Sequence, residues 1–398
     1  MDFVIVGLQA WYYELGSNCK NIALELSKHH RVLYINMPLD RRTILQKRED
    51  PHIAQHLTLV QTRRTEVVEL GPNLWNFSPT RVIESLNWLP STFLFSLFNR
   101  INNKRLASEI RKATAILGFK DYLLFNDNDI FRSFYLKELL QPKRYIYYSR
   151  DNLLAVPYWQ KHGKTLEPRH IAKADIGVAN SIWLADYLRQ YNPDSYYIGQ
   201  GCSLSIFNPD TAHPLPEDLK AIPHPIIGYV GAIVSLRIDI RIILEIARSR
   251  PDWHIIMVGP EDEFFTASEL HSFPNIHFLG RKDLATLPAY IAHCDVCINP
   301  QLVNGMTIGN YPLKIDEYLA MGKPVVATRT VTMKLFEEHT WLADKPEDYV
   351  PLIEKALAED NTELHKKRIA FANEHTWENC IKDLFKAISN HPPRDWQS

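Results

Sequence analysis

The sequence predicts an α/β protein with two doubly wound parallel sheets. Two parts of the chain, residues 3–36 and 226–328, alternate short apolar runs with segments of helical periodicity, and this alternation is typical of β-α-β units. A proline-punctuated stretch, residues 209–225, separates them, and 398 residues are enough for two hydrophobic cores. We therefore expect one domain over residues 1–208 and a second over residues 209–375.

The first domain opens with a β-α-β unit. An apolar run at residues 3–8 leads through a loop to Ser17, which has the chemistry of a helix N-cap. Apolar side chains then recur at helical spacing over residues 18–29, and a second apolar run covers residues 32–36. The first turn carries Gly16 and Ser17 but lacks the full glycine-rich dinucleotide fingerprint, so a nicotinamide cofactor is not expected.

The segment from residue 82 to residue 112 combines apolar and basic side chains, whereas no regular pattern can be assigned over residues 38–79. Trp88 lies in the apolar part and Arg100 in the basic part. Such a pairing is typical of peripheral contact with an anionic membrane surface. A core helix with a solvated basic tail is the alternative, and it is favoured because Pro90 interrupts the amphipathic pattern.

Two further strands are expected in the first domain, at residues 121–126 and 144–148. The second of them runs directly into Arg150 and Asp151. Open α/β sheets bind their ligands just beyond the carboxyl ends of their strands. Both residues are therefore candidates for a functional site.

The second domain alternates strands and helices more regularly. Strands are expected at residues 226–233, 253–258, 276–279, 295–299 and 325–327, with helices at 239–249 and 284–293 between them. This rhythm predicts a parallel sheet with helices on both faces. Successive helices are expected to follow over residues 346–388.

The stretch NYPLKIDEYLAMGKPVVAT, residues 310–328, predicts a loop end, a short helix and a buried strand. Pro312 suits the first helical position and Gly322 the residue after the helix. Lys314 and Glu317 are three residues apart and so share one side of the opening turns. The unpaired N–H groups and positive dipole end of such a helix suit a phosphate. The loop residues expected to border that phosphate are Asn310, Tyr311, Pro312 and Leu313.

The phrase PLKIDEYLAMGKPVVAT resembles the nucleotide-sugar signature of retaining glycosyltransferases of group 1, or family 4. That family carries two glutamates eight positions apart, of which the second holds the donor ribose and the first faces the donor sugar. Glu317 matches the second, whereas Gly309 occupies the position of the first. The resemblance implies GT-B architecture, with two Rossmann-like domains facing a central cleft and a C-terminal helix, residues 376–398, returning to the first domain.

The resemblance extends to other segments of the chain. Residues 231–237 align with a turn whose cations bind the donor diphosphate; Arg237 stands for one cation, and Lys314 is expected to replace the other. Residues 167–181 resemble a family stretch in which a helix begins at the glutamate, here Glu167. The resemblance further implies donor contacts at Gly231 and Arg281, and an acceptor-side cleft that includes Gly16, Ser17 and Arg150.

Composition excludes several other classes of protein. A formal net charge of −1 argues against nucleic acid as a partner. The N-terminus lacks the pattern of a signal peptide, and no apolar run is long enough to span a bilayer. Five scattered cysteines argue against a disulfide framework, and the spacing of Cys294 and Cys297 is interpreted as packing. We expect a cytoplasmic protein, with peripheral contact at the inner face of the membrane as the open alternative.

The resemblance implies transfer of a sugar from a UDP- or GDP-linked donor to a hydroxyl of a polysaccharide, glycolipid or small glycoside. Retention of configuration is expected, and neither a metal nor another cofactor is. Because negative charge builds up on the leaving diphosphate, catalytic roles are assigned to the cations Arg237 and Lys314. Asp151 is assigned a catalytic role because it follows the carboxyl end of a strand. A catalytically idle nucleotide-sugar-binding protein of the same fold is the alternative, supported by Gly309. An epimerase would need additional paired acids near the sugar, and none can be placed.

Overall fold

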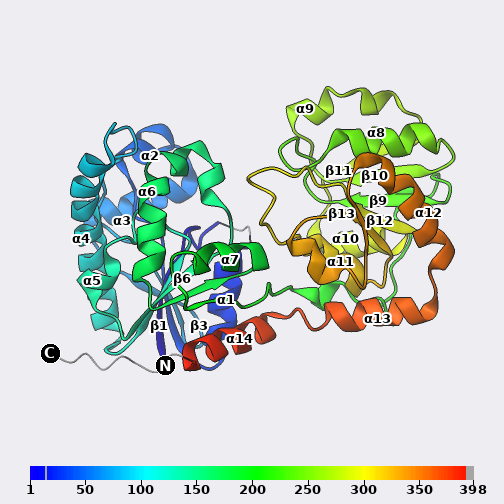
Figure 1. Ribbon diagram of the computed structural model, residues 1–398. Helices are drawn as coiled ribbons and strands as arrows, with labels where there is room; N and C mark the ends of the chain where they lie inside the picture. The colour runs from blue at the N-terminus through cyan, green and yellow to red at the C-terminus, as the bar shows by residue number, and fades with distance from the viewer. Residues whose placement is uncertain (14–15, 391–398) are drawn as a thin grey trace. The chain divides into compact units, whose positions relative to one another are not determined.

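The computed structural model describes residues 1–13 and 16–390, which form two compact units (Figure 1). Unit 1 comprises Met1–Gly199 and the segment from Cys380, and unit 2 comprises Gln200–Asn379. The chain thus passes between the units after Gly199 and after Asn379, whereas the sequence-based boundaries were drawn after residues 208 and 375. Residues 391–398 of the expected C-terminal segment lie outside the described part of the chain.

Unit 1 is built on an eight-stranded sheet with the order β3-β4-β2-β1-β5-β6-β7-β8. All neighbouring strands are parallel except β3 and β4. The strands are β1 (Asp2–Val6), β2 (Arg31–Ile35), β3 (Val67–Gly71), β4 (Leu74–Phe77), β5 (Leu123–Asp127), β6 (Arg144–Ser149), β7 (Ile176–Ala179) and β8 (Ser195–Tyr197). The central strands are buried along nearly their whole length, as expected when helices cover both faces of a sheet.

The helices of unit 1 include several that local signals explain. They are α1 (Asn18–Ser27), α2 (Arg41–Gln46), α3 (Pro51–Thr62), α4 (Thr92–Ile116), α5 (Leu136–Leu140), α6 (Pro157–Lys173) and α7 (Ile182–Arg189), joined by most of α14 (Trp377–Ser389). Ser17 caps α1 as predicted, accepting a hydrogen bond from the Lys20 N–H. The C-terminal helix packs on this unit as predicted, with the Phe385 ring 6.1 Å from that of Phe3.

The predicted helix start at Glu167 is wrong. Helix α6 begins ten residues earlier, at Pro157, and continues through Pro168. Glu167 instead points into the buried side, where it accepts hydrogen bonds from the hydroxyls of Tyr147 (3.0 Å) and Tyr187 (3.1 Å). Burial raises the pKa of this carboxyl group to about 7. The glutamate therefore fixes the inner face of a long helix rather than opening a short one.

Unit 2 contains a six-stranded parallel sheet with the order β11-β10-β9-β12-β13-β14. Its strands are β9 (Ile226–Val230), β10 (His254–Val258), β11 (Ile276–Gly280), β12 (Val296–Asn299), β13 (Val325–Thr328) and β14 (Trp341–Ala343). Its helices are α8 (Ile240–Ser249), α9 (Glu263–Thr266), α10 (Leu287–Ala292), α11 (Leu313–Ala320), α12 (Tyr349–Glu359) and α13 (Thr362–Ala372). The predicted doubly wound architecture is thereby confirmed.

The two cores of unit 2 lie on opposite faces of this sheet. Val230 packs with α10 and α11 in one core, whereas its neighbour Tyr229 packs with α8 and α12 in the other. Cys294 and Cys297 are free and buried, and a side chain at Gly228 would meet the Cys294 sulfur at 2.1 Å. This close contact agrees with the packing interpretation of the two cysteines.

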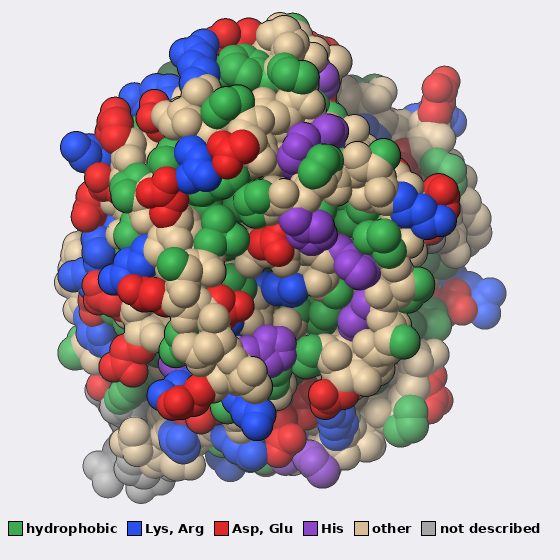
Figure 2. Space-filling model, turned by 90° about the vertical axis from the view of Figure 1, so that its right-hand side faces the viewer, with side chains coloured by type: hydrophobic (Ala, Val, Ile, Leu, Met, Phe, Trp, Pro, Cys, Tyr) green, Lys and Arg blue, Asp and Glu red, His purple; other side chains and the backbone are tan. Residues whose placement is uncertain are grey.

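The surface of the protein carries charges of both signs. On the face presented in Figure 2, acidic and basic side chains are intermixed, in keeping with the net charge of −1. Within the described residues, none of the helices is both long and apolar enough to cross a membrane.

Candidate functional site

A cavity of about 300 Å³ lies within unit 2, where the strand order reverses between β9 and β12. Such switch points are where doubly wound sheets bind their ligands. The residues that line the cavity are Tyr229, Val230, Gly231, Arg237, Ile238, Leu287, Asn299, Gln301, Asn310, Tyr311, Pro312, Leu313, Lys314 and Glu317. Eight of them were singled out from the sequence: Gly231, Arg237, Asn310, Tyr311, Pro312, Leu313, Lys314 and Glu317.

Helix α11 brings the two charged side chains of its opening turns to this cavity. Pro312 is the N-cap residue, one position before the first helical position predicted for it, and Gly322 follows the helix with a φ of +70°, as predicted. Ile315 and Tyr318 point into the core on the other side of the helix. Lys314 and Glu317 are left half-buried beside the cavity.

Lys314 occupies a space that the glycine at position 231 leaves open. Its ammonium nitrogen lies 3.7 Å from the centroid of the Tyr229 ring, a cation–π contact. A Cβ atom at Gly231 would lie 2.7 Å from the same nitrogen, and the φ of Gly231 is +143°, which disfavours any residue with a side chain. Burial and the nearby Arg237 lower the pKa of Lys314 to about 7, although Glu317 opposes this shift.

Glu317 shows the opposite perturbation. Burial raises the pKa of its carboxyl group to about 7; Lys314 counteracts the rise and Asp316 adds to it. A lysine and a glutamate that both titrate near neutrality in one cavity are typical of a functional site rather than of a structural ion pair. A bound anion would stabilise the ammonium group, and hydroxyl donors would stabilise the carboxylate.

Two buried amides in the cavity wall have hydrogen-bonding capacity to spare. The side-chain nitrogen of Asn299 and the side-chain oxygen of Asn310 are buried and have no hydrogen-bond partner among the described residues. Buried polar atoms are nearly always paired, so unpaired ones at a cavity point to a polar ligand. Asn299, at the end of β12, was missed in the sequence, although polar residues at a strand's carboxyl end are a usable signal.

Asp316 is a second residue that sequence reasoning missed. It is fully buried and accepts hydrogen bonds from the Tyr311 hydroxyl (2.8 Å), the His375 Nδ1 atom (2.6 Å) and the Cys202 thiol (3.1 Å). These contacts hold Tyr311 and the first turn of α11 in place. Two of its partners, His375 and Cys202, lie 59 and 114 residues away in the chain, so no local pattern predicts these contacts.

The remaining predicted residues are not among those that line this cavity. Arg281 follows β11 and is not among the lining residues. Gly16, Ser17, Arg150 and Asp151 belong to unit 1. Arg150 donates to Asp127 (2.8 Å) and to Asp151 (2.9 Å).

Asp127, the last residue of β5, and Asp129 form an Asp-x-Asp triplet that sequence reasoning overlooked. Both carboxylates are fully buried and engaged by protein groups. Asp127 accepts from the Leu8 N–H (3.0 Å) as well as from Arg150. Asp129 accepts from the N–H groups of Phe131 and Arg132 (both 2.9 Å) and pairs with the Arg132 side chain. The triplet thus holds the loop after β5, at the switch point between β1 and β5.

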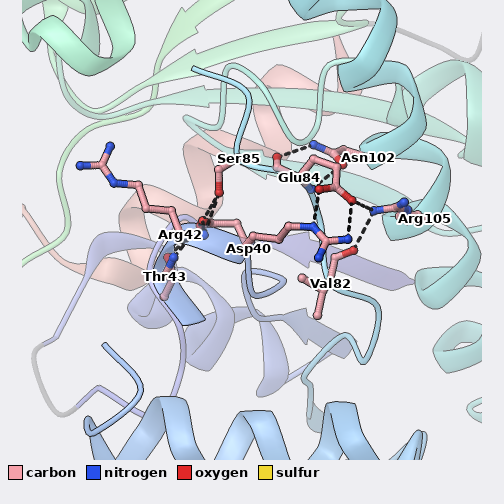
Figure 3. Close-up of polar contacts among 9 residues, drawn as sticks. Asp40, Arg42, Thr43, Val82, Glu84, Ser85, Asn102 and Arg105 are labelled. Carbon is pink, nitrogen blue, oxygen red and sulfur yellow. Dashed lines mark hydrogen bonds and ion pairs between the residues drawn. The ribbon is translucent and has the colours of Figure 1, made fainter. Parts of the chain in front are cut away.

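A second cavity, of about 490 Å³, lies in unit 1 among the loops that follow β2, β4, β5 and β6. Figure 3 shows how its polar wall is fixed. Asp40 caps α2 and accepts a hydrogen bond from the Ser85 hydroxyl (2.5 Å). The Glu84 carboxylate accepts one from Arg105 (2.9 Å), and the backbone of Glu84 is hydrogen-bonded to the Asn102 side chain. The aromatic side chains that line the same cavity are Trp88, Phe95, Phe131 and Tyr158.

Comparison with known proteins places the family match in unit 2. Residues 224–359 match the family model described as glycosyl transferases group 1, a range that contains the whole lining of the unit 2 cavity. TuaH of Bacillus subtilis (strain 168), assigned as a teichuronic acid biosynthesis glycosyltransferase, is 29% identical over 257 residues. That alignment covers 61% of this chain and 62% of TuaH.

Solved structures resemble the chain over almost its full length. HepE of Anabaena, in complex with UDP-glucose, has a TM-score of 0.64 at 15% identity, covering 98% of this chain and 100% of its own. The trehalose-6-phosphate protein from E. coli, bound with UDP-2-fluoro glucose, has a TM-score of 0.67 at 11% identity, covering 99% and 100%. At such identities the likeness concerns the fold. It shows the GT-B fold of two Rossmann-like domains over the whole chain, and the match to the group 1 glycosyltransferases covers residues 224–359, which contain the signature around Glu317.

Proposed function

We propose that the protein transfers a sugar from a nucleotide diphosphate sugar to an acceptor hydroxyl, with retention of configuration and without a metal ion. The observation that carries this proposal is the single cavity that holds Lys314 and Arg237 beside Glu317. The two cations suit a diphosphate, and the carboxylate suits the ribose hydroxyls. UDP-glucose is the first donor to examine because the solved relatives are complexes with UDP-glucose and UDP-2-fluoro glucose; a GDP-linked sugar is the second.

The arrangement favours departure of the nucleotide. As the bond to the sugar breaks, negative charge grows on the diphosphate, and the ammonium of Lys314, the guanidinium of Arg237 and the N–H groups at the start of α11 stabilise it. Because the cavity is partly screened from water, each of these interactions is stronger than at an open surface. The acceptor proton passes to the leaving phosphate, so no separate base is required.

The amides of Asn299 and Asn310 supply the sugar contacts that a glutamate at position 309 would otherwise make. Their unpaired polar atoms can bond the hydroxyl groups of the donor sugar. With glycine at position 309 the carboxylate is absent, but Asn299 and Asn310 still provide polar contacts to the sugar. Tyr311 and Pro312 shape the path between this subsite and the phosphates.

The acceptor is assigned to unit 1. Its 490 Å³ cavity combines the aromatic faces of Trp88 and Tyr158 with the polar groups of Arg42 and Asn87, a mixture that suits a carbohydrate. Arg150 and Asp151, which follow β6, are further candidates for contact with the acceptor. We place the reaction in the cytoplasm, where reducing conditions suit the five free, buried cysteines.

Release of nucleoside diphosphate by the purified full-length protein tests this function. With UDP-glucose or GDP-mannose alone we expect slow hydrolysis, and with the correct glycan or glycolipid acceptor a faster release that EDTA does not reduce. Proton NMR of the product should show the anomeric configuration of the donor. Tight donor binding without turnover for any acceptor would establish the idle binding protein instead, and absence of binding to either donor would overturn the assignment of the cavity.

A further inference from the structure

We propose that unit 1 docks on an anionic membrane surface through an apolar face of helix α4. This face, called here the α4 face, consists of Phe93, Leu94, Leu97, Phe98 and Ile101, with Trp88 just ahead of the helix. The proposal rests on the surface of unit 1 and does not depend on the transferase activity of the chain.

The α4 face is exposed to an unusual degree for such large side chains. Phe93 is 77% exposed, Trp88 73% and Leu97 55%, and Leu94, Phe98 and Ile101 are exposed as well. Their spacing places the helical residues on one side of α4. Large apolar side chains gathered on one exposed helix face mark an interaction site.

Hydrogen bonds of buried asparagines fix the orientation of α4 in which its apolar face points outward. The side-chain amides of Asn99 and Asn103 both donate to the Phe131 carbonyl, at 2.7 and 3.1 Å, and Asn102 exchanges two hydrogen bonds with the backbone of Glu84. Phe95 packs on Phe131 on the same inner side, with ring centroids 4.9 Å apart. Turning the apolar face inward would leave three buried amides without partners or expose them, so α4 holds its apolar residues outward.

The charge around the α4 face selects an anionic partner. Acidic residues are absent from residues 86–108, which include the face, and from residues 152–166, which include most of the adjacent α6. The exposed cations of these two stretches are Arg100, Lys104, Lys161 and Lys164. Basic side chains that border an apolar helical face attract the head groups of anionic lipids while the apolar side chains enter the acyl boundary.

The position of the face suits an acceptor that is anchored in a lipid layer. Lys161 on α6 donates to the carbonyls of Asn87 (3.0 Å) and Trp88 (3.2 Å) and so holds the Trp88 loop beside α6. Trp88 also lines the 490 Å³ cavity of unit 1, together with Tyr158. Docking would bring this cavity to the head-group level. Two interpretations were left open for residues 82–112. Membrane contact accounts for the outward face of α4, and the core-helix interpretation accounts for its inner face.

Co-sedimentation of the full-length protein with vesicles tests the proposal. We expect binding to phosphatidylcholine vesicles that contain phosphatidylglycerol, much weaker binding to phosphatidylcholine alone, and a loss of binding as salt is raised. The double variant Phe93→Ser/Leu97→Ser should weaken binding to the anionic vesicles by about tenfold or more. The double variant Arg100→Glu/Lys104→Glu should do the same and should abolish the preference for anionic lipid.

Matched controls lie in unit 2. Phe264 and Leu284 are 53% and 64% exposed, so Phe264→Ser/Leu284→Ser removes comparable apolar surface; Lys355→Glu/Lys366→Glu makes the same change of charge. Both control variants should bind vesicles like the parent, and all variants should keep its melting temperature. Equal binding by the parent and by Phe93→Ser/Leu97→Ser would contradict the proposal. So would a failure to bind anionic vesicles combined with a dimer in sedimentation velocity that this variant abolishes, because a second copy of the chain would then cover the α4 face.

Discussion

Replacement of Lys314 by methionine is expected to weaken the binding of UDP-glucose by about one to two orders of magnitude, because a charge-assisted hydrogen bond to phosphate is worth about 1.5–3 kcal/mol. Methionine keeps the unbranched apolar stem that packs over Tyr229. Arg237→Met should have a smaller effect, since Arg237 is exposed and Lys314 is half-buried. Isothermal titration measures both, with Lys366→Met, at an exposed lysine in unit 2, as the control. An unchanged dissociation constant of Lys314→Met for UDP-glucose would show that Lys314 does not bind the phosphates.

The same lysine predicts a pH dependence of binding. Because its pKa in the free protein is lowered to about 7 and a bound diphosphate favours the ammonium form, binding above pH 7 requires uptake of a proton. Affinity should therefore fall by up to about tenfold per pH unit as pH rises above 7. UDP-glucose is the right probe, since its diphosphate is esterified on both sides and keeps its charge over this range. Lys314→Met should lose this alkaline limb.

Replacement of Glu317 by glutamine is expected to lower donor affinity by about one to two orders of magnitude, because a charge-assisted bond to the ribose is lost. The parent should bind a deoxyribose donor more weakly than the ribose donor, and the variant should discriminate less between them. With the pKa of Glu317 raised to about 7, the carboxylate is protonated as pH falls below 7. The parent should therefore lose affinity on the acid side, and Glu317→Gln should lose that acid limb.

A helix-dipole effect alone would give a different result. A carboxylate near the start of a helix stabilises the helix by about 0.3–1 kcal/mol. If Glu317 had only this role, Glu317→Gln would lower the melting temperature and leave donor affinity unchanged. Glu363→Gln, in the first turn of α13, is the matched control and should leave affinity unchanged. A stability loss without an affinity loss in Glu317→Gln would place that residue among the structural ones.

The elements that the sequence predicts well are those with local signals. The N-cap Ser17 and the Gly322 end of α11 were correctly placed, and the start of α11 was placed within one residue at Pro312, because each depends on a few neighbouring residues. The same kind of signal was overlooked at Asp40 and Asp50, which cap α2 and α3 in a stretch that we left unassigned. The wrong start at Glu167 arose because a matching phrase was given more weight than the local signal of Pro157 at the true start.

The parts of the site that could not be predicted depend on contacts between distant residues. Lys314 and Glu317 were identified as site residues, but their burial, and hence their titration near pH 7, follows from the Tyr229 ring and the β9 turn. The Asp316 network joins side chains from three separate segments. The exposure of the α4 face likewise depends on where Asn99, Asn102 and Asn103 find their backbone partners.

A crystal structure of the protein with UDP-2-fluoro glucose would show which residues hold the donor. We expect a diphosphate held by Lys314 and Arg237 at the start of α11, ribose hydroxyls bonded to Glu317, and the sugar within reach of Asn299 and Asn310. A nucleotide bound outside the 300 Å³ cavity, or bound within it with its ribose away from Glu317, would overturn the proposed donor site.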